Sequence, residues 1–120
     1  MKKSKVKSYV DLTEGDQHGL MAAIAMQPIS VAMQADQLSF QLYKEGIFDD
    51  TNCGMDGDID HGVLAVGYGH DKESGTDYWL IKNSWGSSWG ENGYIRMVRD
   101  TPHPYGMCAI LRVMSFPVLK

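Results

Sequence analysis

Alternating apolar and polar residues predict two β-strands in the first third of the chain, with a helix between them. Residues 6–12 and residues 29–33 both alternate, so one face of each strand carries the larger apolar side chains. The intervening residues 19–26 are rich in alanine, leucine and methionine, which favour helix. We expect Thr13 to cap this helix at its N-terminus, and Pro28 to end it because proline disfavours helical backbone at the preceding residue.

The pattern changes after residue 46, where it predicts antiparallel strands joined by tight turns. Three short segments are rich in β-branched and aromatic residues and are separated by glycine, aspartate, serine and asparagine; they are residues 63–68, 78–82 and 94–98. Gly67 and Gly69 indicate a bulge or a close backbone approach in the first of these strands. A short helical turn is expected across residues 37–44. The predicted fold class is α+β, with one early helix and an antiparallel sheet that can close into a barrel.

The composition is that of a single soluble domain spanning residues 1–120, with 43% hydrophobic and 22% charged residues. No apolar run approaches the roughly 20 residues that a membrane-spanning helix needs, which excludes that class of protein. The net charge of -4 argues against a nucleic-acid-binding protein, whose surface is typically basic. No glycine-rich phosphate-binding motif is present, so no cofactor is expected.

The first eight residues do not have the pattern of a secretory signal. Polar residues at positions 4, 5, 7 and 8 interrupt the apolar stretch of about 7–15 residues that such a signal needs. This pattern predicts either a cytosolic protein or a chain that is cut from a longer precursor. The lysines at positions 2, 3, 5 and 7 are expected to form a short solvated tail.

Two groups of potential metal ligands do not have the spacing of a metal site. The acidic run at residues 56–60 begins like a calcium-binding loop, but His61 and Gly67 stand where such a loop needs glycine and glutamate. The potential zinc ligands also lack the spacing of a structural site; they are Cys53, His61, His103 and Cys108. No metal is therefore expected. The two cysteines permit one internal disulfide, and residue types alone leave two free buried thiols equally open.

Two blocks in the second half of the chain carry a much more specific signal. Residues 60–69 are Asp-His-Gly-Val-Leu-Ala-Val-Gly-Tyr-Gly, and residues 78–94 are Tyr-Trp-Leu-Ile-Lys-Asn-Ser-Trp-Gly-Ser-Ser-Trp-Gly-Glu-Asn-Gly-Tyr. Together they resemble the C-terminal half of a papain-like cysteine protease, the family that includes the cathepsins. Shorter matches at residues 27–32, 43–48 and 106–109 extend the resemblance over nearly the whole chain.

The resemblance implies a role for four residues in these blocks. His61 matches the histidine that carries the proton between a catalytic thiol and the leaving amine. Asn83 matches the asparagine that accepts a hydrogen bond from the imidazole ring and fixes its orientation. Trp85 matches a residue that shields this hydrogen bond from water, and Trp89 matches one that lines the leaving-group side of the cleft.

Other residues take roles by resemblance alone. Cys53 and Cys108 match a pair that is joined by a disulfide in the family, and a loop of this length adds about 4 kcal/mol of stability in the chain-entropy model. The pocket for the substrate residue that precedes the cleaved one (P2) is matched by small or aliphatic residues; these are Ala32, Ile59, Gly62 and Val113. They imply a preference for leucine, phenylalanine or valine at P2. The sequence after Cys108 departs from the family, since Ala109 stands where glycine is usual.

The nucleophile block of the family is not found in these 120 residues. That block is a Cys-Gly-Ser/Ala-Cys-aromatic sequence roughly 130–150 residues before the histidine and asparagine. The resemblance therefore implies the right-hand, β-barrel lobe of a two-lobed endopeptidase, inactive without the helical lobe that carries the cysteine. The implied partners are a peptide or protein substrate, the Cys-bearing lobe and, through the exposed lobe interface, a second copy of this chain.

Two other functions remain open. The chain can be a non-catalytic module that binds peptides or proteases, or a fragment without a function of its own. The presence of both His61 and Asn83 favours the peptidase, because a pure binding module has no physical need for that pair. The family resemblance implies a lysosomal, vacuolar or secreted location.

Overall fold

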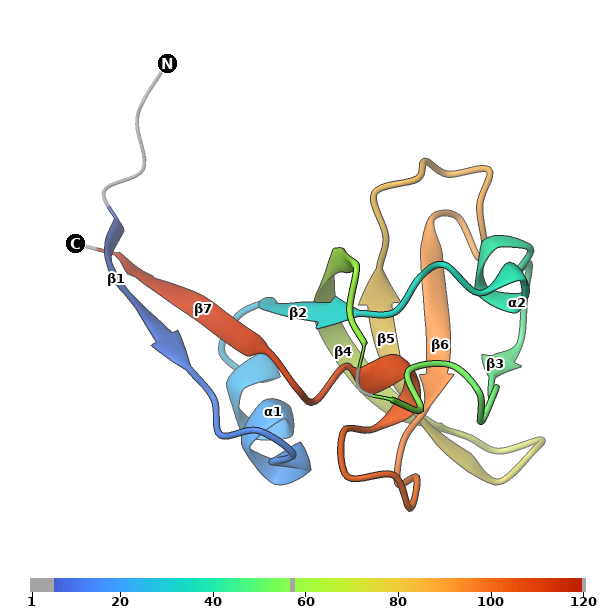
Figure 1. The fold of residues 1–120 in the computed structure, drawn as a ribbon, viewed down its shortest axis with the longest axis horizontal. Helices are drawn as coiled ribbons and strands as arrows, with labels where there is room; N and C mark the ends of the chain where they lie inside the picture. Colours follow the sequence, from blue (N-terminus) through green and yellow to red (C-terminus); the bar gives the residue numbers. More distant parts are fainter. Residues whose placement is uncertain (1–5, 57, 120) are drawn as a thin grey trace.

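Seven strands form one mixed sheet in the computed structural model of the chain, which describes residues 6–56 and 58–119 (Figure 1). The strands are β1 (Val6–Asp11), β2 (Ile29–Met33), β3 (Ile47–Phe48), β4 (His61–Asp71), β5 (Thr76–Lys82), β6 (Tyr94–Val98) and β7 (Met114–Leu119). The helices are α1 (Gln17–Ile24), α2 (Leu38–Gln41) and the 3₁₀ turn η1 (Met107–Ala109). The lysines at positions 2, 3 and 5 and Gly57 of the acidic run lie outside the described residues.

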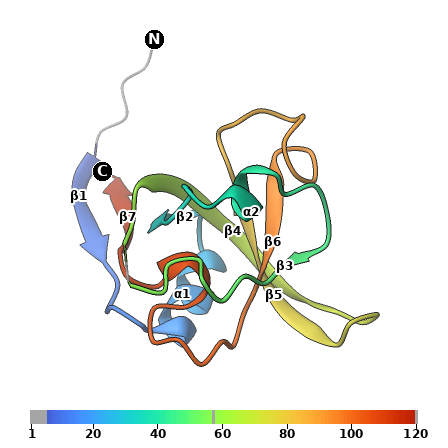
Figure 2. The same cartoon turned by 45° about the vertical axis from the view of Figure 1, so that its right-hand side comes forward.

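The strand order β1-β7-β2-β4-β5-β6-β3 places β1 and β3 at the two edges of the sheet. The α+β class is confirmed, with one departure from the expected antiparallel arrangement: β3 pairs with β6 in parallel. The other neighbouring strands pair antiparallel. β1 and β7 form a ribbon that extends to one side of the molecule, away from β5, β6 and β3 (Figures 1 and 2).

Helix α1 begins at Gln17, four residues after the predicted cap at Thr13. Asp16 is the N-cap instead, and its Oδ1 accepts a hydrogen bond of 2.9 Å from the Gly19 N–H. Thr13 belongs to the preceding turn, where its carbonyl accepts from the Asp16 N–H. The prediction of Thr13 was wrong because threonine and aspartate both favour the N-cap position, and Thr13 takes part in the turn before the helix instead.

No helix in the described part of the chain has the length and apolar character needed to cross a membrane.

The longest strand, β4, contains the bulge that its glycines predict. The pairing of β4 with β5 shifts register between Ala65 and Gly67, so Val66 is an extra residue without a partner in the ladder. Gly69 is the site of a close approach, which was the other feature that the glycines indicated. A Cβ at this position would lie 2.8 Å from the Tyr78 Oη. Both features allow β4 and β5 to curve together as a long hairpin.

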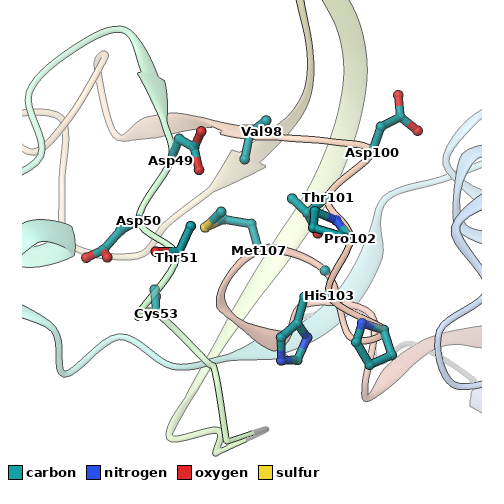
Figure 3. A pocket seen from close by; sticks show the side chains of 12 residues that line it. Asp49, Asp50, Thr51, Cys53, Val98, Asp100, Thr101, Pro102, His103 and Met107 are labelled. Atoms are coloured by element: carbon teal, nitrogen blue, oxygen red, sulfur yellow. The ribbon is translucent and has the colours of Figure 1, made fainter.

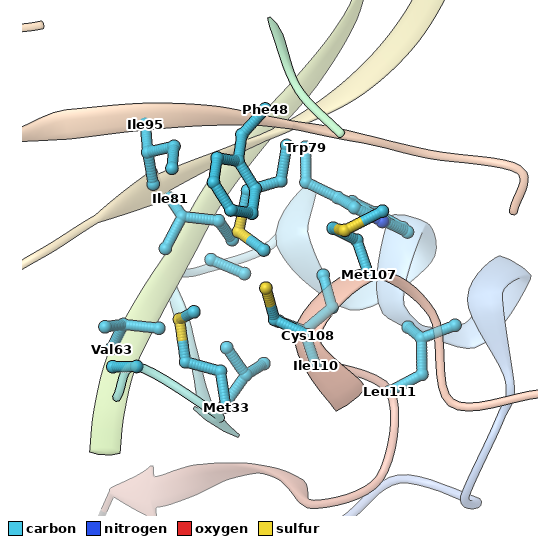
Figure 4. Packing of buried hydrophobic residues seen from close by; sticks show 14 of the residues in the cluster. Met33, Phe48, Val63, Trp79, Ile81, Ile95, Met107, Cys108, Ile110 and Leu111 are labelled. Atoms are coloured by element: carbon cyan, nitrogen blue, oxygen red, sulfur yellow. The ribbon is translucent and has the colours of Figure 1, made fainter. Parts of the chain in front are cut away.

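The hydrophobic core lies between the sheet and the segment that follows β6 (Figure 4). Met33, Ile81 and Ile95 come from the sheet, and they face Met107 and Ile110 of the C-terminal segment. The residues of β2 are alternately buried and at least partly exposed, as the alternation in its sequence predicts. Each fully buried large apolar side chain stabilises the fold by about 1.5–3 kcal/mol.

The disulfide between Cys53 and Cys108 is formed, which confirms the pairing that the resemblance implied. It joins the loop after β3 to η1, and the Cys108 N–H also donates to the Cys53 carbonyl at 3.1 Å. Gly54 lets the two backbones approach, because a Cβ at this position would lie 2.4 Å from the Cys108 carbonyl carbon. The bridge and this backbone contact fix the C-terminal segment against the rest of the domain.

Candidate active site

The β4–β5 hairpin brings His61 and Asn83 together. His61 is the first residue of β4, and Asn83 follows Lys82, the last residue of β5. The two strands are antiparallel, with Leu64 opposite Lys82, so the start of one lies beside the end of the other. The His61 Nε2 lies 2.8 Å from the Asn83 Oδ1.

The surroundings of Asn83 determine the direction of this hydrogen bond. Its Oδ1 also accepts from the Ser84 N–H at 2.8 Å, and the backbone N–H of Asn83 donates to the Gly93 carbonyl at 3.0 Å. An amide oxygen only accepts, so the His61 Nε2 carries the hydrogen and donates it. Asn83 is only 5% exposed, so its Oδ1 is a buried acceptor for the imidazole ring; its role in orienting the ring stays a prediction.

The other ring nitrogen of His61 is unpaired in the part of the chain that the structure describes. Within residues 6–56 and 58–119, no hydrogen-bond partner is present for the Nδ1 atom, and the side chain is half-buried. A neutral imidazole with Nε2–H has a lone pair on Nδ1. This nitrogen can therefore take a proton from a nucleophile and return it to a leaving group.

Strand β2 and the residues just after it hold the backbone at Asp60 and His61. Met33 is the ladder partner of His61, and its carbonyl accepts from the Asp60 N–H at 3.0 Å. The Asp60 Oδ1 accepts from the Ala35 N–H at 2.8 Å. The sequence showed Asp60 beside His61 but gave no sign of this contact, which joins two segments 25 residues apart.

Gln34 connects these contacts to the disulfide. Its N–H donates to the Cys108 carbonyl at 3.0 Å, and its Oε1 accepts from the Gly54 N–H at 2.6 Å. No pattern in the sequence identified Gln34, because the contacts form only after the disulfide loop has folded onto β2. The support of His61 therefore extends from β2 to the bridged loops.

Trp85 lies against the imidazole ring of His61. The two ring centroids are 5.2 Å apart with an interplanar angle of 33°, and Trp85 remains 39% exposed. Trp85 also makes T-shaped contacts with Trp89 and Phe40, at centroid distances of 5.4 Å and 5.3 Å. This position fits the predicted role of Trp85 in shielding the His61–Asn83 hydrogen bond from water, and that role stays a prediction.

Trp89 is buried in this aromatic cluster, with 9% of its surface exposed. Its indole N–H donates to the carbonyls of Phe40 and Gln41, both at 3.2 Å. Trp89 therefore anchors the turn that follows Asn83 to α2 and supports Trp85. A role in lining the leaving-group side of a cleft stays a prediction.

An ion pair fixes the far side of the same turn. Arg96 donates to both carboxylate oxygens of Glu91, at 2.8 and 2.9 Å, and the Gly46 N–H donates to Glu91 at 3.1 Å. These hydrogen bonds, that from Arg96 above all, hold the pKa of Glu91 below its ordinary value. The Tyr43 hydroxyl donates to the Gly46 carbonyl, and burial raises the pKa of this phenol. The network holds the loop before β3 against the turn that carries Trp89.

Three of the predicted P2 residues lie side by side. Ala32 is the ladder partner of Gly62, and the Ala32 N–H donates to the Val113 carbonyl at 3.1 Å. Val113 is 47% exposed, and Gly62 also faces outward. Ile59 is half-buried and lies two residues before His61 on the connection into β4. Their role as a P2 pocket stays a prediction.

A hollow of about 320 Å³ lies beside Asn83 on strands β2, β4 and β5. Its side chains include Ser30, Leu64, Lys82 and Ser84, all of which are exposed. This surface combines hydrogen-bonding groups, one cation and an exposed leucine next to the candidate catalytic pair. In the described residues, no three histidine, cysteine, aspartate or glutamate side chains are grouped so that they could hold a metal ion.

The sequence matches the family model described as papain family cysteine protease over residues 1–118. A probable cysteine protease of Arabidopsis thaliana, RD21B, is 49% identical over 115 residues, which cover 96% of this chain and 24% of that protein. Cathepsin L of Sarcophaga peregrina is 49% identical over 112 residues, which cover 92% of this chain and 32% of that protein.

Solved structures of plant proteases match the fold. The bromelain protease from Ananas comosus, solved with the inhibitor E64, is 41% identical with a TM-score of 0.87, covering 96% of this chain and 51% of that chain. The Carica candamarcensis cysteine protease CMS1MS2, solved with E-64, is 42% identical with a TM-score of 0.86. The match covers 98% of this chain and 51% of that chain. The chain thus spans about half of these solved chains and about a quarter to a third of the curated relatives.

Proposed function

Because this chain belongs to the papain family of cysteine proteases, we propose that it supplies the histidine and asparagine of a thiol endopeptidase. His61 is the proposed proton carrier and Asn83 the residue that orients it. The thiol comes from a Cys-bearing lobe, since these 120 residues contain no Cys-Gly-Ser/Ala-Cys-aromatic block and both cysteines are joined in the disulfide. The chain alone is therefore inactive.

The observation that carries this proposal is the one-sided hydrogen bonding of His61. Its Nε2 donates to the buried Asn83 at 2.8 Å, whereas Nδ1 has no partner among the described residues. A thiol placed against Nδ1 would give up its proton to the ring, and the imidazolium would then stabilise the thiolate. The same nitrogen would protonate the amine that leaves when the peptide bond breaks.

We propose that the Cys-bearing lobe packs on the exposed face beside Asn83. The hollow lined by Ser30, Leu64, Lys82 and Ser84 lies there, and Trp85 is half exposed next to His61. Exposed apolar groups such as Leu64 and Trp85 cost about 25 cal/mol per Å² while they face water. Without its partner lobe, the chain therefore associates with a second copy through this face.

The test is a mixing experiment. The chain is assayed with a fluorogenic Leu-Arg substrate, first alone and then with the separately produced N-terminal lobe of a cathepsin L. We expect hydrolysis only in the mixture, because neither part holds both the thiol and its proton carrier. Sedimentation of the chain alone and of the mixture reports self-association and its replacement by a one-to-one complex.

Two results would contradict this function. Hydrolysis by the chain alone, lost when Cys53 or Cys108 is replaced, would place the nucleophile in this chain. A tight complex in which peptides bind but are never cleaved would support the alternative, a non-catalytic peptide- or protease-binding module.

We further propose that the active mixture prefers leucine, phenylalanine or valine at P2. Ala32, Gly62 and Val113 meet on one outward face, and none of them carries an acid that could pair with an arginine. Paired substrates that differ only at P2 measure this preference as a ratio of kcat/KM. A ratio that favours arginine over leucine would contradict it, while Val113→Glu should move the ratio toward arginine.

A further inference from the structure

A second cavity, of about 580 Å³, lies between two loops that take no part in the candidate active site. One wall is the loop of residues 49–53 after β3, and the other is the segment of residues 98–107 that leads from β6 into η1 (Figure 3). The volume is in the range of pockets that hold small organic ligands. No role in peptide hydrolysis follows from its position.

The two walls of the cavity are fixed before any ligand arrives. The Cys53–Cys108 disulfide joins the first loop to the end of the second. His103 of the second wall is held at both ring nitrogens. Its Nε2 lies 2.9 Å from the Met55 carbonyl, and its Nδ1 accepts from the Tyr105 N–H at 3.1 Å. A ring that accepts at Nδ1 is neutral and donates at Nε2, so this wall presents no imidazolium. A cavity fixed in this way loses little entropy when it binds.

The interior of the cavity is mostly apolar. Val98 at the end of β6 and the buried side chain of Met107 line it, together with Cys53 and Pro102 (Figure 3). Methionine adapts its shape to different apolar groups, and its sulfur contacts aromatic rings favourably. A small apolar or aromatic group would therefore pack against this surface.

The charge at the cavity comes from three carboxylates, and one of them has no partner among the described residues. Asp50 accepts from Ser39 and from the Asn52 N–H, and Asp100 accepts from Gln17. Among the residues that the structure describes, no group donates to the carboxylate of Asp49. In Figure 3 the carboxylates of Asp50 and Asp100 point outward from the lining residues, and the Asp49 side chain is also exposed.

We propose that this cavity is a binding site for a primary amine carried on an apolar or aromatic body. The ammonium group pairs with Asp49, which lacks a protein partner, and the body covers Val98 and Met107. Asp50 and Asp100 add to the negative potential at the entrance, which excludes anionic ligands of the same shape. The site does not depend on the proposed proteolysis, because no residue of the catalytic pair lines it.

Three probes of equal length separate charge from shape: 4-phenylbutylamine, 4-phenylbutanol and 4-phenylbutyrate. Each is titrated into the ¹⁵N-labelled chain, and amide shifts are followed at Val98, Thr101 and Met107. We expect saturable shifts with the amine and no binding of the acid. The alcohol should bind about fivefold more weakly than the amine, because it lacks the partly exposed ion pair with Asp49.

The variant Asp49→Asn should lose most of the preference for the amine over the alcohol, with an unchanged amide spectrum elsewhere, because only the weaker potential of Asp50 and Asp100 remains. Asp71→Asn is the matched control, because Asp71 lies at the end of the β4–β5 hairpin and pairs with Ser74. It should retain the preference for the amine. The proposal is overturned if the wild-type chain binds the amine no better than the alcohol, or if the shifts lie outside the two walls.

Discussion

Replacing His61 by alanine is expected to lower kcat/KM of the mixed lobes by about 10³-fold or more, almost entirely through kcat. The imidazole has two functions in the proposed mechanism: it stabilises the thiolate, and it protonates the leaving amine. The Nδ1 atom that performs both is the ring nitrogen without a protein partner in the described residues. Initial rates with a Leu-Arg substrate, at several substrate concentrations, measure the change.

Two other variants make this result specific. His70→Ala is the matched control, because His70 lies on the same strand and pairs with Asp77 at the exposed end of the hairpin. It should leave kcat within about twofold of the wild type, as surface substitutions usually do. Asn83→Ala should lower kcat by about 10²-fold, since the ring keeps its nitrogens but loses its fixed orientation.

The association of the lobes must be measured separately for each variant. If His61→Ala loses activity only because the lobes no longer bind, sedimentation will show it. A His61→Ala mixture that binds normally and keeps more than a tenth of the wild-type kcat would contradict the assigned role.

The sequence predicted those elements whose signal is local. β2 and β6 have the bounds that their alternation and β-branched residues indicated, and the bulge in β4 lies beside Gly67, one of the two glycines that predicted it. β3 and β7 were not predicted. β3 has only two residues, and β7 contains Pro117, which lowers strand propensity and is tolerated because it lies beyond the pairing of β7 with β2.

The candidate site, too, could be predicted from the sequence only where the signal is local. His61 and Asn83 were identifiable from the blocks around them, and the structure places their side chains at hydrogen-bonding distance. The contacts that hold them could not be predicted, because Asp60 to Ala35 and Gln34 to Gly54 depend on how distant segments come into register. The Asp49 cavity also arises only when two loops are joined by the disulfide.

The double variant Cys53→Ser/Cys108→Ser is expected to lower the free energy of unfolding by about 4 kcal/mol. The bridge spans 55 residues, and constraining a loop of that length in the unfolded chain gives a value of this size. A stability of about 5–15 kcal/mol is typical of a native domain, so this loss removes between about a quarter and most of it. Urea unfolding followed by tryptophan fluorescence measures the change, with Trp79 reporting the core.

Gln34→Ala separates the covalent bridge from the hydrogen bonds around it. This variant keeps the disulfide and removes only the side-chain acceptor of the Gly54 N–H, so it should cost about 1 kcal/mol. Because Gln34 lies between the disulfide and the contacts of Asp60, both variants should also shift the His61 ring resonances, while His70→Ala should not. Equal losses from Gln34→Ala and the double cysteine variant would show that the hydrogen bonds, rather than the bridge, fix the C-terminal segment.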